Sequence, residues 1–332
     1  MTQTPLISIR DLKKTFFVKL GAFGETEATV NAVDALTFDI LQGETLSLVG
    51  ESGCGKSTAG FAILNLHRPT QGEVIYDDTD IAKLTQSEMR PFRSRLQVVF
   101  QDPFASLNPR MTVGEVIAEP LRFHRICKKS EISAQVAELL RDTGLPEYFT
   151  NRFPHELSGG QRQRVVIARA LAFRPVFIVC DEAISALDVS IQAQIINLLI
   201  DLQQKHNLTY LFIAHDLAVV RHMSSRVAVM YLGRLAELAP TDALYDEPLH
   251  PYTRALMKSV PSPDPEKERA RSGAALTGDV PSPLDPPKGC YFHTRCPMAQ
   301  PRCQIEKPEW REHSPGHWVA CHYAGEQLDR AI

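Results

Sequence analysis

The sequence of 332 residues lacks the features that place a chain in a membrane or in the secretory pathway. It has no apolar run of the roughly 18 or more residues that a transmembrane helix needs. Its first residues, Met1–Pro5, do not follow the basic and then apolar layout of a secretory signal. We therefore expect a cytoplasmic chain that reaches a membrane only through partner proteins.

An excess of charge is also missing, because 36 Lys and Arg residues stand against 39 Asp and Glu residues, for a formal net charge of -3. This balance gives no support for a global nucleic-acid-binding surface, which needs an excess of basic residues. The sequence contains no internal repeat, no long coiled-coil insertion and no second nucleotide-binding motif. Its length suits one sizeable core domain and a smaller one.

The sequence does contain a phosphate-binding loop, since Gly50–Ser57 matches the pattern G-x-x-x-x-G-K-[ST]. The apolar run Thr45–Val49 leads into it and a helical pattern begins at Ser57, which is the strand–loop–helix context that the motif requires. Backbone N–H groups would converge on the phosphates, Lys56 would reach the β- and γ-phosphates, and Ser57 would bind Mg²⁺. A chance glycine-rich turn is the alternative, and the flanking elements disfavour it. The predicted ATP and Mg²⁺ site comprises Gly50, Ser52, Gly53, Cys54, Gly55, Lys56, Ser57 and Thr58.

Cys54 lies inside this loop, and we expect it to be a small space-filling residue rather than a nucleophile. The N-terminus of the following helix could nonetheless lower the pKa of its thiol and make it reactive to alkylation. Bound ATP should then shield it.

Four polar residues follow apolar runs that indicate buried strands. They are Asp181 and Glu182 after Phe177–Cys180, Gln101 after Leu96–Phe100, and His215 after Tyr210–Ala214. A carboxylate at a strand end beside the γ-phosphate can bind Mg²⁺ or act as a general base towards water. Two solvated carboxylates are the alternative for the acidic pair, and they fit the preceding apolar run poorly. A structural histidine is the alternative for His215.

A second phosphate-binding element lies downstream, in Leu157, Ser158, Gly159, Gly160 and Gln161. Ser158 is a good N-cap for a helix that extends to Phe173, and the glycines permit a phosphate to approach closely. Such a helix start is itself an anion site. Because the loop at Gly50–Ser57 already holds the phosphates of the chain's own nucleotide, we expect this element to bind the γ-phosphate of a nucleotide on a partner chain.

Alternating strands and helices predict an α/β core. Antiparallel entry strands are predicted at Ile7–Arg10 and Ala35–Ile40. Parallel strands covered on both faces are predicted at Val176–Cys180 and Tyr210–Ala214, with a helix at Ile191–Lys205 between them. Residues 102–154 indicate an inserted helical segment. After about Pro240 the dense prolines predict a linker leading to a small tail module.

The order of these motifs resembles that of the ABC-type ATPases, whose signature motif is matched by Leu157–Gln161. The resemblance implies an α/β P-loop NTPase fold with a RecA-like parallel sheet, an antiparallel subdomain and a helical subdomain. It also implies that Glu182 polarises the attacking water, that Asp181 lies beside Mg²⁺, that Gln101 is the Q-loop glutamine and that His215 is the switch histidine.

Three smaller features follow from the same resemblance. Ser185–Asp188 resembles the D-loop that crosses the dimer interface, so Asp188 joins the signature residues at the partner's ATP. Ala183-Ile184 stands where the family has Pro-Thr, which removes a φ constraint and leaves the stiffness of the D-loop open. Phe16, or else Phe17, is placed like the aromatic residue that stacks on adenine, and a buried core Phe is the alternative.

Three segments narrow the resemblance to the ATP-binding subunits of peptide or nickel importers, closest to the dipeptide/oligopeptide F-type subunit. They are Phe100–Pro109, His250–Thr253 and Pro281–Cys290. The resemblance implies a nucleotide-binding domain over residues 1–240, with a helical subdomain at about 102–165, and an importer-type C-terminal extension over residues 241–332.

The function implied by the resemblance is ATP hydrolysis that powers import of di- or oligopeptides, with the chain bound peripherally at the cytoplasmic face of the membrane. The implied partners are a second ABC ATPase subunit, identical or homologous, two transmembrane permease subunits and an extracytoplasmic peptide-binding protein, but no nucleic acid. The alternatives are import of nickel or another small solute, and a soluble ABC ATPase that acts on nucleic acid or the ribosome. A regulatory subunit with a silent ATP site is disfavoured by the intact Lys56, Asp181, Glu182 and His215.

Four of the seven cysteines lie in the tail, at Cys290, Cys296, Cys303 and Cys321. In a reducing compartment such a quartet favours metal ligation over disulfides. Four thiolates suit a [4Fe–4S] cluster or a Zn²⁺ ion, and the lack of paired C-x₂-C knuckles disfavours zinc. The resemblance to importer subunits that hold a cluster favours iron–sulfur, and free or disulfide-forming thiols remain the other alternative.

Overall fold

The computed structural model describes residues 4–20, 26–258 and 278–326. The chain divides into two compact units, each of which is described by itself. The first unit is Met1–Thr4, Leu41–Thr45 and Leu84–Ile213, and the second is Pro5–Ile40, Leu46–Lys83 and Ala214–Ile332. The domain boundary expected at residue 240 does not coincide with this division and stays a prediction.

The strands of the first unit are the apolar runs of the sequence. β6 (Leu96–Val99), β7 (Phe177–Asp181) and β8 (Thr209–Ile213) lie side by side in that order and are parallel. Every residue of β7 and β8 is buried, as expected for parallel strands that are covered on both faces. These three strands are confirmed to within one residue at each end.

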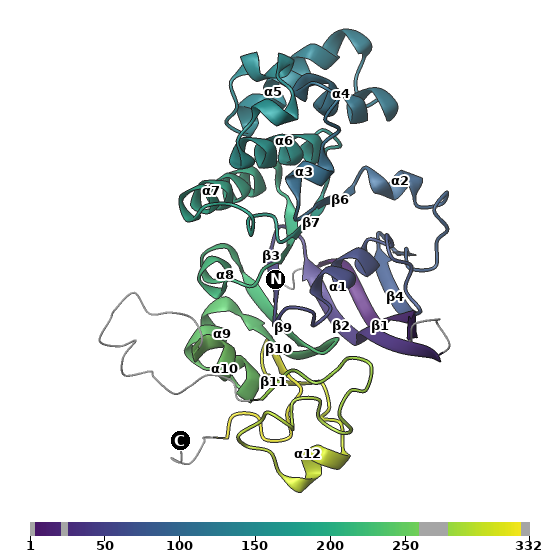
Figure 1. The fold of residues 1–332 in the computed structure, drawn as a ribbon, viewed down its shortest axis with the longest axis vertical. Helices are drawn as coiled ribbons and strands as arrows, with labels where there is room; N and C mark the ends of the chain where they lie inside the picture. The colour runs from purple at the N-terminus through teal and green to yellow at the C-terminus, as the bar shows by residue number, and fades with distance from the viewer. Residues whose placement is uncertain (1–3, 21–25, 259–277, 327–332) are drawn as a thin grey trace, which may run out of the picture. The chain divides into compact units, whose positions relative to one another are not determined.

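The first unit also contains helices, among them those within residues 102–154, where the sequence pattern predicts a helical segment. The α-helices are α2 (Arg90–Arg93), α3 (Pro103–Ser106), α4 (Val113–Phe123), α5 (Ile132–Asp142), α6 (Gly159–Leu171) and α7 (Val189–His206), and the 3-10 helices are η1 (Lys129–Glu131), η2 (Glu147–Asn151) and η3 (Pro154–Glu156). α4, α5 and α6 pack against one another (Figure 1). α4 begins at a capping box, in which the Thr112 hydroxyl accepts from the Glu115 N–H at 3.3 Å and the Glu115 carboxylate accepts from the Thr112 N–H at 2.7 Å.

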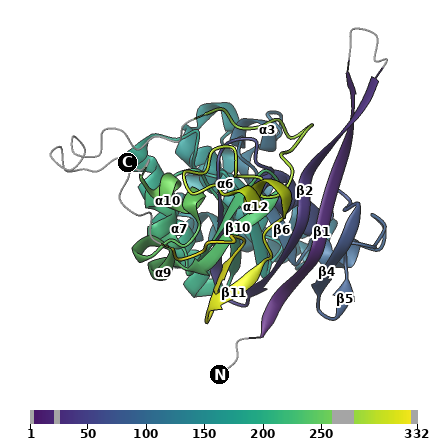
Figure 2. The same cartoon turned by 90° about the horizontal axis from the view of Figure 1, so that it is seen from below.

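The second unit contains a four-stranded sheet. Its strands, in the order β2-β1-β4-β5, are β2 (Thr26–Leu41), β1 (Pro5–Leu20), β4 (Gln71–Tyr76) and β5 (Thr79–Asp80). β1 and β2 are long neighbouring strands (Figure 2), and β1 pairs with β4 in antiparallel register. The antiparallel entry sheet expected at the start of the chain is therefore present, although its first two strands are much longer than the sequence pattern suggests.

The second unit also contributes mixed strand pairings around the phosphate-binding loop. β3 (Thr45–Val49) pairs in parallel with β9 (Arg226–Tyr231), and antiparallel pairs then follow through β10 (Arg234–Pro240), β12 (His317–Val319) and β11 (Arg311–Ser314). The helices of this unit are α1 (Lys56–Ile63), α8 (Leu217–Met223), α9 (Thr241–Asp246), α10 (Pro251–Lys258) and α12 (Pro301–Ile305).

The segment after Pro240 differs from the expected linker. α9 begins at Thr241, and α10 begins with Pro251, a position where proline's missing N–H breaks no helical hydrogen bond. The tail then returns to the sheet, because β12 pairs with β10 through Glu237↔Val319 and Leu238↔Trp318. The linker prolines Pro261, Pro263 and Pro265 lie outside the described residues.

A buried carboxylate fixes this return. Glu237 is fully buried and accepts hydrogen bonds from the N–H groups of Leu249 at 2.8 Å and His250 at 2.9 Å, and it lies 2.6 Å from the ring of His317. One side chain of β10 thereby connects the start of α10 to β12. Across the described residues, no helix combines the length and apolar character needed to cross a membrane.

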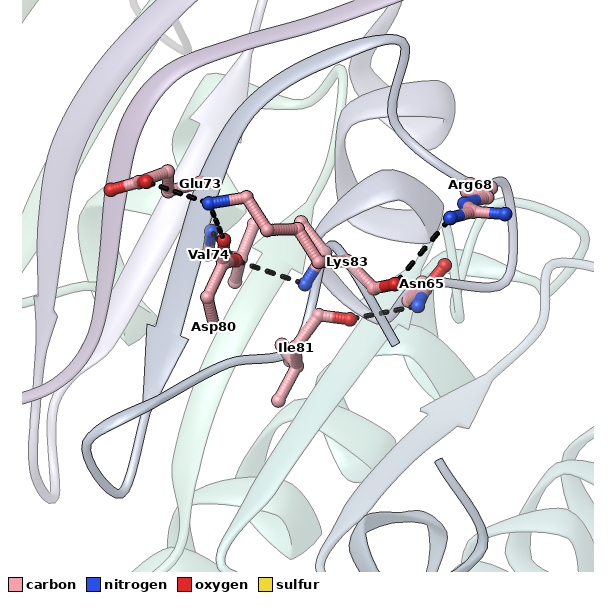
Figure 3. Close-up of polar contacts among 8 residues, drawn as sticks. Asn65, Arg68, Glu73, Val74, Asp80, Ile81 and Lys83 are labelled. Carbon is pink, nitrogen blue, oxygen red and sulfur yellow. Dashed lines mark hydrogen bonds and ion pairs between the residues drawn. The ribbon is translucent and has the colours of Figure 1, made fainter. Parts of the chain in front are cut away.

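Polar contacts close the small hairpin of β4 and β5 (Figure 3). Asp80 Oδ1 accepts from the N–H groups of Val74 at 3.1 Å and Ala82 at 3.2 Å, while Asp80 Oδ2 pairs with Lys83 Nζ at 2.8 Å. Lys83 also contacts Glu73 at 2.9 Å. The short strands are thus held by side-chain bonds as well as by their ladder.

Asn65 links this hairpin to the end of α1, and replacing it tests that link. Its buried Nδ2 donates to the Ile81 carbonyl at 2.8 Å, and its backbone is left-handed with φ of 50°. We expect Asn65→Ala to lower the free energy of unfolding by about 2 kcal/mol, because Ala disfavours this backbone and leaves a buried carbonyl unpaired. Asn207→Ala is the matched control, since Asn207 has the same φ of 50° but an exposed side chain. Equal losses in urea denaturation of the two variants would contradict the role of the buried bond.

Candidate functional site

The phosphate-binding loop of the second unit joins β3 to α1 through two backbone positions that only glycine can occupy. Gly50 has φ of 152°, and a Cβ there would lie 2.2 Å from the Met230 carbonyl oxygen. Gly55, at the start of α1, has φ of 101°, and its Cβ would lie 2.0 Å from the Ala32 carbonyl oxygen. The loop is therefore pressed against neighbouring backbone at both ends.

Lys56 is buried within the curl of this loop. Its Nζ donates to the carbonyl oxygens of Gly50 at 2.8 Å and Glu51 at 3.0 Å. Ser52 and Gly53 form the exposed tip, and Ser57 follows Lys56 as the second residue of α1. A curled run of backbone, a lysine and a helix N-terminus is an arrangement that can bind a polyphosphate.

The thiol of Cys54 does not have the lowered pKa that was considered for it. Cys54 is 4% exposed, and burial raises the pKa of its thiol. Lys56 Nζ, 3.9 Å from the sulfur, acts in the opposite direction but does not outweigh burial. Cys54 therefore fits the space-filling role that the sequence favoured. The alternative, a thiol whose pKa is lowered by the helix N-terminus, is wrong, because burial raises this pKa.

The predicted catalytic carboxylate lies in the first unit, at the end of β7. Asp181 is buried at the last position of the strand, and Glu182 follows with a left-handed φ of 45°. Gln101, which follows β6, donates from Nε2 to Glu182 Oε2 at 2.7 Å. The structure thus brings together two predicted site residues that are 81 positions apart.

The turn after Glu182 is closed without the proline that is usual there. Ser185 donates to the Glu182 carbonyl twice, from its N–H at 3.1 Å and from its hydroxyl at 3.0 Å. Ala183 and Ile184 are both buried. Hydrogen bonds and burial therefore constrain the turn in which a proline ring is missing.

The signature segment forms the helix start that was predicted. Ser158 caps α6 by accepting from the Gln161 N–H at 3.3 Å, and the Gln161 side chain accepts from the Ser158 N–H at 3.0 Å. Gly159 lies against Leu187, just before α7, and Gly160 lies against Ile191, in the first turn of α7. A Cβ on Gly159 would lie 3.3 Å from Leu187, and one on Gly160 would lie 2.5 Å from Ile191. Asp188 is exposed at the N-cap of α7.

Two arginines of α6 connect the signature helix to the segment after Gln101, and the sequence motifs did not reveal them. The Arg162 guanidinium lies 3.7 Å from the ring centroid of Phe104. Arg169 donates to the Ser106 carbonyl at 2.5 Å. Asp102 caps the short helix α3 between these contacts by accepting from the Phe104 N–H at 2.7 Å. In the sequence they are two basic residues of the helix predicted to extend to Phe173, and that pattern does not indicate what they contact.

The remaining predicted nucleotide residues belong to the second unit. His215 is exposed between Ala214, whose N–H donates to the Leu48 carbonyl at 3.3 Å, and Asp216, which caps α8. Phe16 is 36% exposed and meets His67 edge to face at 5.8 Å between centroids. Phe16 is therefore not a fully buried core residue, and its stacking on adenine stays a prediction.

The four tail cysteines converge on one pocket of the second unit. Its lining includes Cys290, Cys296, Cys303 and Cys321. Burial raises the pKa of the Cys290 thiol. It also raises the pKa of the Cys296 thiol to about 12 and that of the Cys321 thiol to about 11. Within residues 4–20, 26–258 and 278–326, all seven cysteines are free and no three His, Cys, Asp or Glu side chains are arranged to hold a single metal ion.

Two family models match the chain: ABC transporter, over residues 33–185, and Oligopeptide/dipeptide transporter, C-terminal region, over residues 236–303. The oligopeptide transport ATP-binding protein AppF of Bacillus subtilis (strain 168) is 52% identical over 321 residues, which are 96% of this chain and 98% of that protein. Among solved structures, a dimer of the ATP-binding cassette MJ0796 bound to ADP and Pi in a post-hydrolysis state gives a TM-score of 0.62 at 31% identity, over 71% of this chain and 98% of that chain. The structure of cbiO1 from Clostridium perfringens, part of the ABC transporter complex cbiONQ, gives a TM-score of 0.62 at 25% identity, over 73% of this chain and 91% of that chain.

The burial of Cys54 predicts slow alkylation. At neutral pH we expect iodoacetamide to modify Cys54 at least about tenfold more slowly than the half-buried Cys127, because the thiolate is the reacting form and burial disfavours it. Peptide mass mapping over time gives both rates in one sample, and a denatured sample, in which both should react alike, is the control. Faster labelling of Cys54 than of Cys127 would show that the helix terminus dominates after all.

Proposed function

Since this chain belongs to the ATP-binding proteins of ABC-type peptide importers, we propose that its hydrolysis of MgATP drives the uptake of di- or oligopeptides through a membrane complex. The observation that carries the proposal is the joint occurrence of a complete phosphate loop, the Gln101–Glu182 pair and the importer-type C-terminal region in one chain. Each of these elements supports one part of the activity.

The chain's own ATP would be bound by the loop and hydrolysed with the help of the strand-end carboxylates. Lys56 and the backbone N–H groups would hold the phosphates, while Ser57 and Asp181 would hold Mg²⁺. Glu182 would accept a proton from the attacking water. The hydrogen bond from Gln101 to Glu182 Oε2 supports this role, because it orients the carboxylate. His215 is proposed as the residue that senses the γ-phosphate.

The signature segment Leu157–Gln161 and Asp188 would act on ATP bound by a second ABC subunit. The support is the capped N-terminus of α6, where two glycines without side chains give a phosphate access to backbone N–H groups. The related cassette MJ0796 is described as a dimer bound to ADP and Pi. We propose a homologous or identical ATPase partner, so that each site is composed of two chains.

The membrane partners would contact the helical part of the first unit. Large apolar side chains are exposed there, with Phe104 at 63%, Phe123 at 82% and Tyr148 at 62%. Aromatic side chains are enriched at protein–protein interfaces relative to the rest of a protein surface. We propose that one of two permease subunits docks on this surface at the cytoplasmic face of the membrane, and that the two permease subunits receive peptide from an extracytoplasmic binding protein.

The tail pocket would hold a four-thiolate iron–sulfur cluster. The side chains of Cys290, Cys296, Cys303 and Cys321 line one pocket, and four thiolates are the ligand count of such a group. Because burial raises the pKa of three of the thiols, ligation must displace their protons. The cluster would crosslink the four cysteine positions and so stabilise a small module that has little hydrophobic core of its own.

Replacing the general base tests the proposed function. In the assembled complex, Glu182→Gln should lower ATP turnover by about a hundredfold or more, because a neutral amide cannot accept the proton of water. ATP binding should be retained. Glu309→Gln, at an exposed position, is the matched control and should turn over ATP normally. Unchanged turnover in Glu182→Gln would exclude this carboxylate as the base.

Metal analysis tests the cluster. Protein purified without oxygen should contain about four iron and four sulfide per chain. Cys303→Ser should lose them, and Cys127→Ser, outside the pocket, should keep them. Colourless protein with one zinc per chain would identify a zinc site, and protein without metal would leave the thiols as free ones.

A further inference from the structure

The phosphate loop is attached to the C-terminal region by two contacts at Glu51. Arg295 donates two hydrogen bonds to the Glu51 carboxylate, from Nη1 to Oε2 at 2.7 Å and from Nη2 to Oε1 at 3.0 Å. The Glu51 N–H donates to the Tyr252 hydroxyl at 2.9 Å. Glu51 is the second residue of the loop motif, and its two partners follow it by 244 and 201 residues.

Both partners of Glu51 are packed firmly in the second unit. The Arg295 side chain is 4% exposed and Tyr252 is fully buried. The Tyr252 N–H donates to Nδ1 of His250 at 3.0 Å, and burial lowers the pKa of His250 to about 4, so the neutral ring can accept. Phe292 packs against the rings of Tyr231 and Tyr252, with centroids 5.3 Å away in both cases. The groups that hold Glu51 are therefore themselves fixed.

The charge of Glu51 is unfavourable in a loop that binds phosphates. A carboxylate near an anionic ligand repels it, and the repulsion grows where protein excludes water. A bidentate guanidinium neutralises the carboxylate and also fixes its direction. Arg295 lies between Phe292, whose carbonyl accepts its N–H at 3.0 Å, and Cys296, so the charge comes from the cysteine-bearing segment.

We propose that Arg295 and Tyr252 are positioning residues of the ATP site, through which the C-terminal region holds the first turn of the phosphate loop and cancels the charge of Glu51. The inference rests on the ATP site of the proposed function and extends it to a part of the chain outside the nucleotide motifs. Replacing Arg295 would then leave an unpaired carboxylate at Glu51 that weakens ATP binding, although no residue of the phosphate-loop motif has been changed.

The test uses the full-length chain and titration with MgATP, followed by displacement of a fluorescent ATP analogue. We expect Arg295→Gln to raise the Kd for ATP about tenfold, and the loss to shrink as salt is added, because it arises from repulsion between charges. Arg302→Gln is the matched control, since Arg302 lies in the same region but pairs with the exposed Glu306, at 2.7 Å, and not with a residue of the phosphate loop. It should bind ATP like the parent chain.

A double variant separates charge from folding. Glu51→Gln combined with Arg295→Gln removes both charges, and we expect its Kd to return to within about threefold of the parent value because no carboxylate is left to repel phosphate. If Arg295 served only to fold the tail, the double variant would bind as poorly as Arg295→Gln alone. That result would overturn the proposal.

Tyr252→Phe tests the second contact with little change in packing. It removes the hydroxyl that accepts from Glu51 and keeps the buried ring, so we expect about a threefold to fivefold rise in the Kd for ATP. Tyr245→Phe is the control, because it also removes a tyrosine hydroxyl of the second unit, but one that donates to the Leu217 carbonyl and not to the phosphate loop. Unchanged affinity in both Tyr252→Phe and Arg295→Gln would overturn the proposal, whereas a parent chain that binds no ATP would instead overturn the proposed function.

Discussion

The close approach of the phosphate loop to neighbouring backbone is the constraint on which the nucleotide site depends. Gly50 lies against the Met230 carbonyl and Gly55 against the Ala32 carbonyl, at separations that exclude any Cβ. The Gly233 N–H also donates to the Cys54 carbonyl at 2.9 Å. These contacts fix the backbone conformation of the loop at both ends, and Lys56 is buried inside the loop. The direction of Glu51 towards the C-terminal region follows from the same conformation.

Local signals explain why much of the fold could be predicted. The runs at β3, β7 and β8 are continuous and apolar because both faces of these strands are covered, so the sequence marks their ends closely. Ser158 and Gln161 form a capping box within four residues, which a sequence pattern also shows. The segment after Pro240 carries no such signal. Its prolines suggest a linker, yet Pro251 opens a helix and the tail returns to β10 through Glu237.

The candidate site was predictable where its chemistry lies in contiguous motifs and hidden where it depends on distant partners. The bond between Gln101 and Glu182 joins two motifs that could each be recognised alone. By contrast, Arg295 belongs to no nucleotide motif, and only the folded chain places it against Glu51. Cys54 shows the same limit for electrostatics. Its position at a helix start suggested a lowered pKa, but burial, which the sequence does not report, raises it.

Packing within the first unit couples two proposed roles: that of the signature segment at the partner's ATP, and that of Gln101 and Glu182 at the chain's own ATP. α6 carries the signature glycines at its start, and its Arg162 and Arg169 hold α3, which directly follows Gln101. Gly160, at the start of the same helix, packs so closely against Ile191 that there is no space for a Cβ between them. A shift of α6 on contact with a partner's phosphate would therefore move the segment after Gln101 and the start of α7 together, because close-packed groups transmit displacement rather than absorb it. Since Gln101 orients Glu182, contact of α6 with the partner's ATP would change the position of the general base that acts on the chain's own ATP.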